Sequence, residues 1–388
     1  MYAGYLSLYM LSQGVTKGQL GLITSIGLIA NMVIALLSPY ITDKFGRRNA
    51  TLIFGIIGWN LPMIFWILAN DITLFIVGTI VNAFAYVPMN SCQCLLIEDS
   101  SPEERIHIFN FMQVATIFAG FFAPLGGILI SKFTFVPAMR IILVITVIMM
   151  FTQFVVRHLF VKETKIGKIK MEQMKNVKIG SVFKDYLLAL KRISKDSFLV
   201  IAIILRTINF IQLTMKNTFL VVLITERLGF GAETMALFNT LAAIVMLIVL
   251  ILITPLLARV TKRWPIALGL ICHICSTLIL LLSPSNQNYF LLITCAVFDA
   301  LGIAITTPRV DALFANSTKN EDRSVTYSVM YVLLLIVSTP FGYIGGLLSE
   351  IDTRLPFLLT FVLLLCALLI LLFSMKKEKT ISATITIE

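Results

Sequence analysis

The chain is a series of long apolar runs separated by short polar segments. A transmembrane helix needs about 20 consecutive apolar residues, and every run except the first has about that length. The pattern predicts an all-α integral membrane protein with twelve transmembrane helices, the first of them truncated. The runs are 1–11, 18–41, 51–69, 73–97, 108–131, 135–156, 197–224, 233–257, 264–283, 288–314, 325–348 and 354–374.

Composition supports a membrane location. Of the 388 residues, 58% are hydrophobic and 13% are charged, whereas soluble domains average about 45–50% apolar and about 25% charged residues. A soluble chain of this length could not bury so much apolar surface, so the lipid bilayer is the expected surroundings.

The positive charges follow a topological rule. Loops after alternate runs carry lysine and arginine, while the remaining loops are short and nearly free of cations. Cytoplasmic loops are the ones enriched in lysine and arginine, so both termini are expected in the cytoplasm and the protein in the plasma or inner membrane. This rule also accounts for the net charge of +11, and no nucleic-acid partner is expected.

One polar segment differs from the rest. Residues 157–196 hold eleven lysines and arginines against four acids, without long apolar runs. The expected organisation is an N-terminal six-helix bundle at 1–157, a basic cytoplasmic linker at 158–196, a C-terminal six-helix bundle at 197–375 and a cytoplasmic tail at 376–388.

The two halves repeat each other. Gly14 matches Gly229 and Arg48 matches Arg263 at an offset of 215 residues, and Pro137 matches Pro356 at an offset of 219. Halves with the same topology are related by an axis along the membrane normal. In this register, roughly 19 residues at the start of the first helix of the second half have no counterpart in the first half.

A short motif now suggests a family. Residues 43–48, Asp-Lys-Phe-Gly-Arg-Arg, resemble the D-(R/K)-x-G-R-(R/K) loop between helices 2 and 3 of major facilitator superfamily transporters. "IEDSSPEER" (97–105) is similar to the family's loop after helix 4, and "APLGG" (123–127) to the helix-5 motif of its antiporters. Two departures stand out: Pro39 replaces a glycine that favours close packing of helix 2 on helix 11, and helix 4 lacks the arginine of many proton antiporters.

The resemblance gives the charged loop a gating role. Gly46 permits the tight turn, and Asp43 is expected at the positive N-terminus of helix 11, near Ser324. Arg47, next to Arg48, is expected at the acidic end of helix 4, at Glu98 and Asp99. Exposed ion pairs of this kind each contribute about 1 kcal/mol or less to stability, so they can break during a transport cycle. The alternative is that these cations only set orientation.

The family's central cavity is implied to lie between helices 1, 4, 7 and 10. At 100° per residue, these four helices carry polar stripes. The expected cavity residues are Tyr5, Tyr9, Asn82, Tyr86, Asn90, Gln93, Arg206, Asn209, Lys216, Asp299 and Arg309. The tyrosine stripe has packing as its alternative role.

Ionisable groups at membrane depth are functional candidates, since placing each of them in the membrane costs roughly 2.5–3.5 kcal/mol of insertion free energy. Lys216 and Asp299 lie within about one turn of each other in depth and can pair. With Arg206 and Arg309 the site carries excess positive charge, which favours an anionic solute. Asp299 is the candidate for proton coupling. The alternative is a structural ion-pair network between helices 7 and 10.

The leading functional hypothesis is a secondary active transporter, expected to be a monomer, that moves a small anionic or amphipathic solute by alternating access with a coupling ion, expected to be a proton. A multidrug-type efflux antiporter is one alternative. A receptor or scaffold with the same fold, which does not transport, is another.

Enzymatic activity is not expected. The sequence contains no P-loop and no G-x-S-x-G motif, and its three histidines are far apart in sequence. Cys272-His273-Ile274-Cys275 has the spacing of a zinc site but would need two more ligands, so we expect these residues to pack. No cofactor and no metal are predicted.

Overall fold

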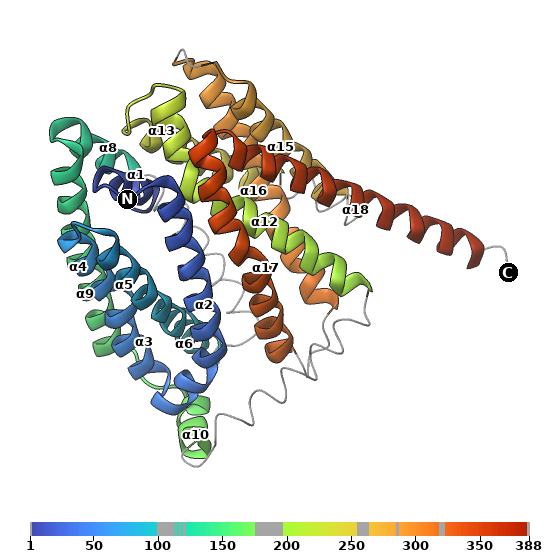
Figure 1. Ribbon diagram of the computed structural model, residues 1–388. Coiled ribbons are helices and arrows are strands. Elements are labelled where there is room, and N and C mark those ends of the chain that lie inside the picture. The colour runs from blue at the N-terminus through green and yellow to red at the C-terminus, as the bar shows by residue number, and fades with distance from the viewer. Residues whose placement is uncertain are drawn as a thin grey trace.

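The computed structural model describes residues 2–98, 112, 115, 118, 122–174, 197–253, 264–284, 287–317 and 323–385. Every regular element within these ranges is helical (Figure 1), which confirms the expected all-α membrane fold. Ten helices in these ranges are long and apolar enough to cross a membrane. Of the other two expected spans, run 1–11 forms only a short helix, and run 108–131 lies partly outside the described residues.

Two of the described spans of the N-terminal bundle, Arg47–Leu68 and Ile72–Leu96, each contain a short π-helical or 3-10 segment between two α-helices. The elements of this bundle are η1 (Ala3–Tyr5), α1 (Leu6–Ser12), α2 (Lys17–Phe45), α3 (Arg47–Gly55), η2 (Ile56–Asn60), α4 (Leu61–Leu68), α5 (Ile72–Asn82), η3 (Ala83–Ala85), α6 (Tyr86–Ile97), α8 (Ala123–Lys132) and α9 (Phe135–Phe160). A short helix, α10 (Lys165–Gln173), follows this bundle.

The C-terminal bundle has longer uninterrupted helices. Its elements are α12 (Ser197–Val222), η5 (Leu223–Arg227), α13 (Thr234–Ile248), η6 (Val249–Ile253), α15 (Trp264–Leu282), α16 (Tyr289–Ser317), α17 (Arg323–Ile351) and α18 (Leu355–Ile385). The ends of the spans agree with the apolar runs to within a few residues, except that α18 continues well beyond run 354–374. The exact domain boundaries stay predictions.

Charge distinguishes the two ends of the molecule. The basic end carries Lys44, Arg47, Arg48 and α10, and the short-loop end carries the turns at residues 13–16, 69–71 and 352–354. Figure 1 shows the two bundles close together where α8 and α13 meet, at the short-loop end, and farther apart toward α10.

The internal repeat reappears in the backbone. Gly14 ends the turn after α1 with φ of 88°, and Gly229 occupies the equivalent turn after η5 with φ of 72°. Both values lie in the left-handed region that favours glycine. The repeat therefore reflects a shared backbone conformation as well as shared residue types.

Helices α2 and α17 form the most intimate contact between the halves. A side chain at Gly21 would place its Cβ 2.6 Å from the Gly342 carbonyl oxygen and from the Gly346 Cα. The hydroxyl of Ser25 donates to the Thr339 carbonyl at 2.6 Å and accepts from the Tyr343 amide at 2.8 Å. The doubt raised by Pro39 was therefore misplaced, because the close approach occurs about 27 Å away, 18 residues along α2 at 1.5 Å per residue.

Buried apolar side chains show where the halves adhere. One continuous core at the short-loop end joins both bundles and includes Tyr9, Phe75 and Ile142 from one half and Phe219 and Phe238 from the other. Toward the basic end, the described clusters around Leu270 and Ala83 lie within single bundles, and a small cluster joins Leu28 of α2 to Leu334 and Leu335 of α17. The described side chains thus seal the short-loop end more completely than the basic end.

Candidate functional site

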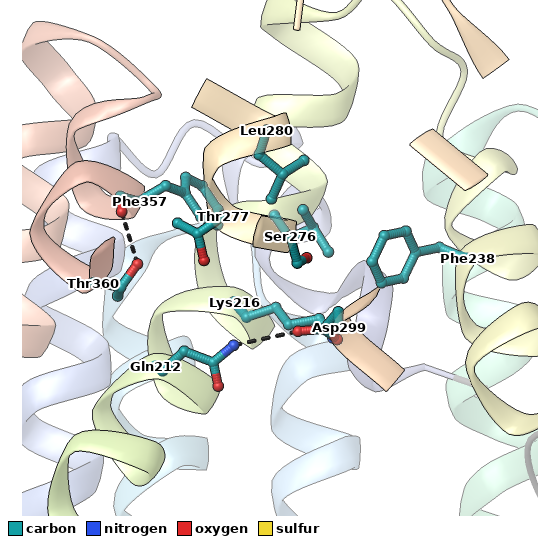
Figure 2. Close-up of a pocket in the computed structure, with 10 residues that line it drawn as sticks. Gln212, Lys216, Phe238, Ser276, Thr277, Leu280, Asp299, Phe357 and Thr360 are labelled. Atoms are coloured by element: carbon teal, nitrogen blue, oxygen red, sulfur yellow. Dashed lines mark hydrogen bonds and ion pairs between the residues drawn. The ribbon is translucent and has the colours of Figure 1, made fainter. Parts of the chain in front are cut away.

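Lys216 on α12 and Asp299 on α16 form an ion pair through Nζ and Oδ2 (Figure 2). Their side chains are 15% and 3% exposed, respectively. Gln212, one turn before Lys216, donates its amide to Asp299 Oδ1 at 3.3 Å. The contact expected between Lys216 and Asp299 is present, and it lies inside the C-terminal bundle.

His273 on α15 completes this cluster. Its Nδ1 lies 3.5 Å from Asp299 Oδ1 and 3.4 Å from the Gln212 amide nitrogen. The residue is 1% exposed, and its Nε2 has no hydrogen-bond partner. Sequence reasoning assigned His273 to packing, although an ionisable residue in the middle of the apolar run 264–283 was itself a signal.

A small cavity adjoins the ion pair. It lies among α12, α13, α15, α16 and α18, and its wall combines Lys216 and Asp299 with hydroxyl groups and rings, as Figure 2 shows. Its free space is enough for about one water molecule. The polar lining is Gln212, Ser276, Thr277 and Thr360, and the apolar lining is Leu220, Phe238, Leu280 and Phe357.

Phe238 limits the freedom of the lysine. Lys216 Nζ lies 5.0 Å from the centroid of the Phe238 ring, a distance at which a cation is attracted to the ring face. The ammonium group is therefore held between a carboxylate and an aromatic ring. An anion that reached Lys216 would have to compete with Asp299 for it.

The other expected cations do not join this cluster. Arg206 lies ten residues before Lys216 on α12, about 15 Å along the helix. The Arg309 guanidinium donates to the Ile305 carbonyl of its own helix at 3.0 Å. Asn209 lies between Arg206 and Lys216 and is half-buried. The positive groups are thus distributed along the depth of the C-terminal bundle.

Some residues of the polar stripe on the fourth expected span form hydrogen bonds inside their own half. Asn82 donates to the Gly58 carbonyl at 2.8 Å, and Asn90 donates to Thr42 at 3.4 Å. Tyr86 contacts Tyr331 of the other half, with ring centroids 5.2 Å apart. Gln93 is exposed. Tyr86 is thus the member of this stripe whose described contact reaches the other half.

The tyrosines of the first span are buried at the short-loop end. Tyr5 and Tyr9 are 2% and 0% exposed. The Tyr9 hydroxyl donates to the Trp66 carbonyl at 3.1 Å, and its ring meets Phe75 edge-on at a centroid distance of 5.8 Å. In this conformation both tyrosines belong to the core that joins the halves.

The side chains of the charged loop, residues 43–48, contact residues of their own bundle. Arg47 is 3% exposed and pairs with Glu98 at 2.9 Å and with Asp43 at 2.8 Å. The expected contact of Arg47 with the acidic end of the fourth span is present, while Asp99 lies outside the described residues. Asp43 was expected at the start of α17, but the ion pair it forms is with Arg47. The side chains at the start of α17, residues 323–328, lie outside the described part of the chain, so the contact of Asp43 with that helix stays a prediction.

The start of the linker, residues 161–173, also binds this loop. The carboxylate of Glu163 accepts the Arg47 amide at 3.1 Å and the Arg48 amide at 2.9 Å, at the N-terminus of α3. Thr164 donates to Glu98, which connects α10 to the Arg47 network. Gly46, with φ of 81°, leaves room for Glu163 and Met171 where a Cβ would not fit. Sequence reasoning treated this segment only as a linker.

Glu163→Gln is expected to destabilise the protein by about 1–2 kcal/mol. The reason is that a carboxylate at a helix N-terminus makes charge-assisted hydrogen bonds to free amides. Thermal unfolding of the purified protein in detergent measures this effect. Lys168→Gln changes an exposed charge on α10 and is the matched control. Equal unfolding temperatures for the two variants would contradict a structural role for Glu163.

Ionic contacts between the halves occur at the short-loop end. Lys17 at the start of α2 pairs with Glu226 of η5 at 2.6 Å, and Glu350 of α17 accepts the Gly18 amide at 2.9 Å. Nearby, Arg354 donates hydrogen bonds that lower the pKa of Asp352 to about 2, so this loop keeps its negative charge at physiological pH. These contacts were not anticipated, because the sequence does not show which loop residues face each other.

Comparison with known proteins supplies independent information. A model of the family described as Major Facilitator Superfamily matches residues 1–290 and 202–386. An uncharacterized MFS-type transporter, YqjV of Bacillus subtilis (strain 168), is 26% identical over 126 residues, which are 32% of this chain and 30% of that protein. The chain therefore matches less than a third of the length of this relative.

Solved structures share the fold across nearly the whole chain. The nucleoside transporter NupG superposes with a TM-score of 0.70 at 13% identity, covering 98% of this chain and 95% of its own. A peptide transporter POT mutant in complex with sulfate gives 0.73 at 14% identity, covering 98% and 91%. The xylose transporter XylE from E. coli, in a partially occluded inward open conformation, gives 0.70 at 11% identity, covering 97% and 93%.

Proposed function

The chain belongs to the major facilitator superfamily, and from this premise we propose that it is a secondary active transporter for a small anionic solute. The two bundles rock against each other, and the α2–α17 contact at Gly21 forms when the short-loop end closes, so that a site between the bundles opens to one side of the membrane at a time. The coupling ion is a proton, and the protein acts as a monomer in the plasma or inner membrane.

The orientation follows from the distribution of charge. The basic end faces the cytoplasm, because lysine and arginine concentrate in cytoplasmic loops. The short-loop end then faces outward and the C-terminus lies in the cytoplasm, whereas the short helix at Leu6–Ser12 lies toward the outer end, so the expected cytoplasmic N-terminus does not fit the described residues. With this orientation, the described conformation is closed to the outside.

One observation carries the proposal: among the described residues, a large apolar core joins the halves at the short-loop end, whereas farther toward the basic end a much smaller cluster, Leu28 with Leu334 and Leu335, joins them and the clusters around Leu270 and Ala83 stay within single bundles. A protein that only scaffolds a partner has no need for halves that adhere at one end. A transporter requires this asymmetry, because closing one end and opening the other defines each half of its cycle.

The choice of an anionic solute rests on Lys216. Its charge is compensated by Asp299 in the absence of solute, and its side chain is more exposed than the aspartate. A solute carboxylate or phosphate can replace Asp299 as the partner of Lys216 with a charge-assisted hydrogen bond. A neutral solute gains no comparable interaction there.

Uptake into proteoliposomes tests the proposal. The purified protein is reconstituted with an acidic exterior, and a panel of labelled small carboxylates and phosphate esters is supplied with neutral and cationic solutes of similar size. Accumulation of an anion that stops on addition of a protonophore is expected. Reversal of the gradient distinguishes import from export. Accumulation of cations alone would contradict the anionic assignment.

A further inference from the structure

We propose that His273 is the residue that takes up the proton when an anionic solute separates Lys216 from Asp299. This inference deepens the proposed function and rests on it. Its test below needs no solute, so it can fail while transport itself is demonstrated.

The geometry around the imidazole places its Nδ1 between an amide donor and a carboxylate. The amide nitrogen of Gln212 lies 3.3 Å from Asp299 Oδ1 and 3.4 Å from His273 Nδ1. Both amide hydrogens are used when Nδ1 accepts one of them, which leaves the single ring hydrogen on Nε2. A proton that adds to the ring takes the Nδ1 lone pair in place of the Gln212 hydrogen bond, and the new Nδ1–H lies 3.5 Å from Asp299 Oδ1, measured from the nitrogen.

The ring has little freedom to move away from Asp299. A Cβ at Gly302 of α16 would come within 2.7 Å of the His273 ring, so the absence of a side chain there lets the imidazole pack flat against α16. His273 is 1% exposed, and its Nε2 has no partner. A buried polar atom without a partner among the described residues is costly, so burial of this histidine needs the contacts that its Nδ1 makes with Gln212 and Asp299.

Among the described residues, few other ionisable groups lie close enough to Asp299 and His273 to compete with them for a proton. From α12, the groups at the cluster are Gln212 and Lys216. From α16 they are Asp299 and Cys295, whose thiol contacts Ser276. Within α15 itself, Cys272 and Cys275 flank the histidine. From α18, the apolar side chains Leu364 and Ala367 occupy the neighbouring cluster, and Cys366 is exposed.

Charge balance connects the histidine to the solute. Without solute, Lys216 is positive, Asp299 is negative and His273 is neutral, so the cluster has no net charge. A monovalent anion on Lys216 adds one negative charge in a buried setting, where an unbalanced charge is strongly unfavourable. One proton taken from the aqueous phase adds to the Nδ1 lone pair, and the resulting imidazolium pairs with Asp299. Anion and proton therefore enter together, and the cluster is neutral again.

Histidine ring nitrogen NMR tests this step directly. The chain contains three histidines, so labelling them with ¹⁵N gives few signals, and His273→Gln identifies the one of interest. Lys216→Gln removes the partner of Asp299, as the solute would. At pH 7.5 we expect a neutral ring at position 273 in the parent and an imidazolium in Lys216→Gln. The double variant Lys216→Gln/Asp299→Asn should return the ring to neutral.

Two results would overturn the proposal. One is a neutral His273 in Lys216→Gln, which would mean that Asp299 itself takes the proton. The other is an imidazolium that persists in the double variant. The signal of His158, on α9 in the other bundle, serves as the internal control and should not change. If Lys216→Gln does not fold, Lys216→Met, which removes the same charge with an unbranched apolar side chain, replaces it, and the same two results would overturn the proposal.

Discussion

Asp299→Asn is expected to abolish gradient-driven accumulation of solute while exchange of solute across the membrane continues. The change removes the negative charge that alternates between Lys216 and His273, so proton uptake no longer accompanies solute binding. Solute can still meet Lys216, which permits exchange. Counterflow and gradient-driven uptake in proteoliposomes measure the two activities separately.

The same substitution leaves the Lys216 ammonium without its partner. Removing one member of a buried pair costs about 3–5 kcal/mol, so the yield of folded protein must be measured alongside transport. Asp352→Asn, in a loop outside the spans, is the matched control and should transport at the parental rate. If Asp299→Asn does not fold but Asp299→Asn/Lys216→Gln does, the pair has a structural role. Unchanged accumulation by Asp299→Asn would show that coupling resides elsewhere.

Gly21→Val is expected to prevent closure of the short-loop end and to stop transport. A Cβ at this position would lie 2.6 Å from backbone atoms of Gly342 and Gly346, and backbone cannot move aside as a flexible side chain can. Overpacking of a tight contact costs about 1–3 kcal/mol. Because the strain exists only when α2 and α17 are in contact, the variant favours a conformation with this end open.

Reaction of introduced cysteines measures this shift. Tyr9→Cys lies in the joined core and is inaccessible in the described conformation, so a water-soluble thiol reagent should label it faster when Gly21→Val is present. Val33→Leu adds volume to an exposed face of the same helix and should leave labelling unchanged. Equal labelling with and without Gly21→Val would contradict the role given to the α2–α17 contact.

The fold could be predicted from the sequence, because the length of an apolar run and the charge of a loop are local properties of the chain. Ten apolar runs coincide with spanning helices, and the turns at Gly14 and Gly229 share a left-handed backbone. The pairing of Lys216 with Asp299 followed from helix geometry alone, since both are charged groups at similar depth.

The remaining features depend on tertiary arrangement. His273 lies on α15, a helix that the family resemblance does not assign to the cavity, and only packing of α15 on α16 places it beside Asp299. Glu163 reaches the α3 N-terminus because the linker folds back over Gly46. The burial of Tyr5 and Tyr9 depends on which end of the protein is closed, and a sequence contains no record of conformation.

Paired spin labels at the two ends test the alternating-access account most directly. In a background without the native cysteines, Lys132→Cys with Leu282→Cys spans the halves at the short-loop end, and Lys44→Cys with Trp264→Cys spans them at the basic end. All four positions are exposed. The account predicts that conditions which lengthen the first distance, such as a change of pH or the Gly21→Val substitution, shorten the second. Distances that stay fixed, or that lengthen together, would contradict it.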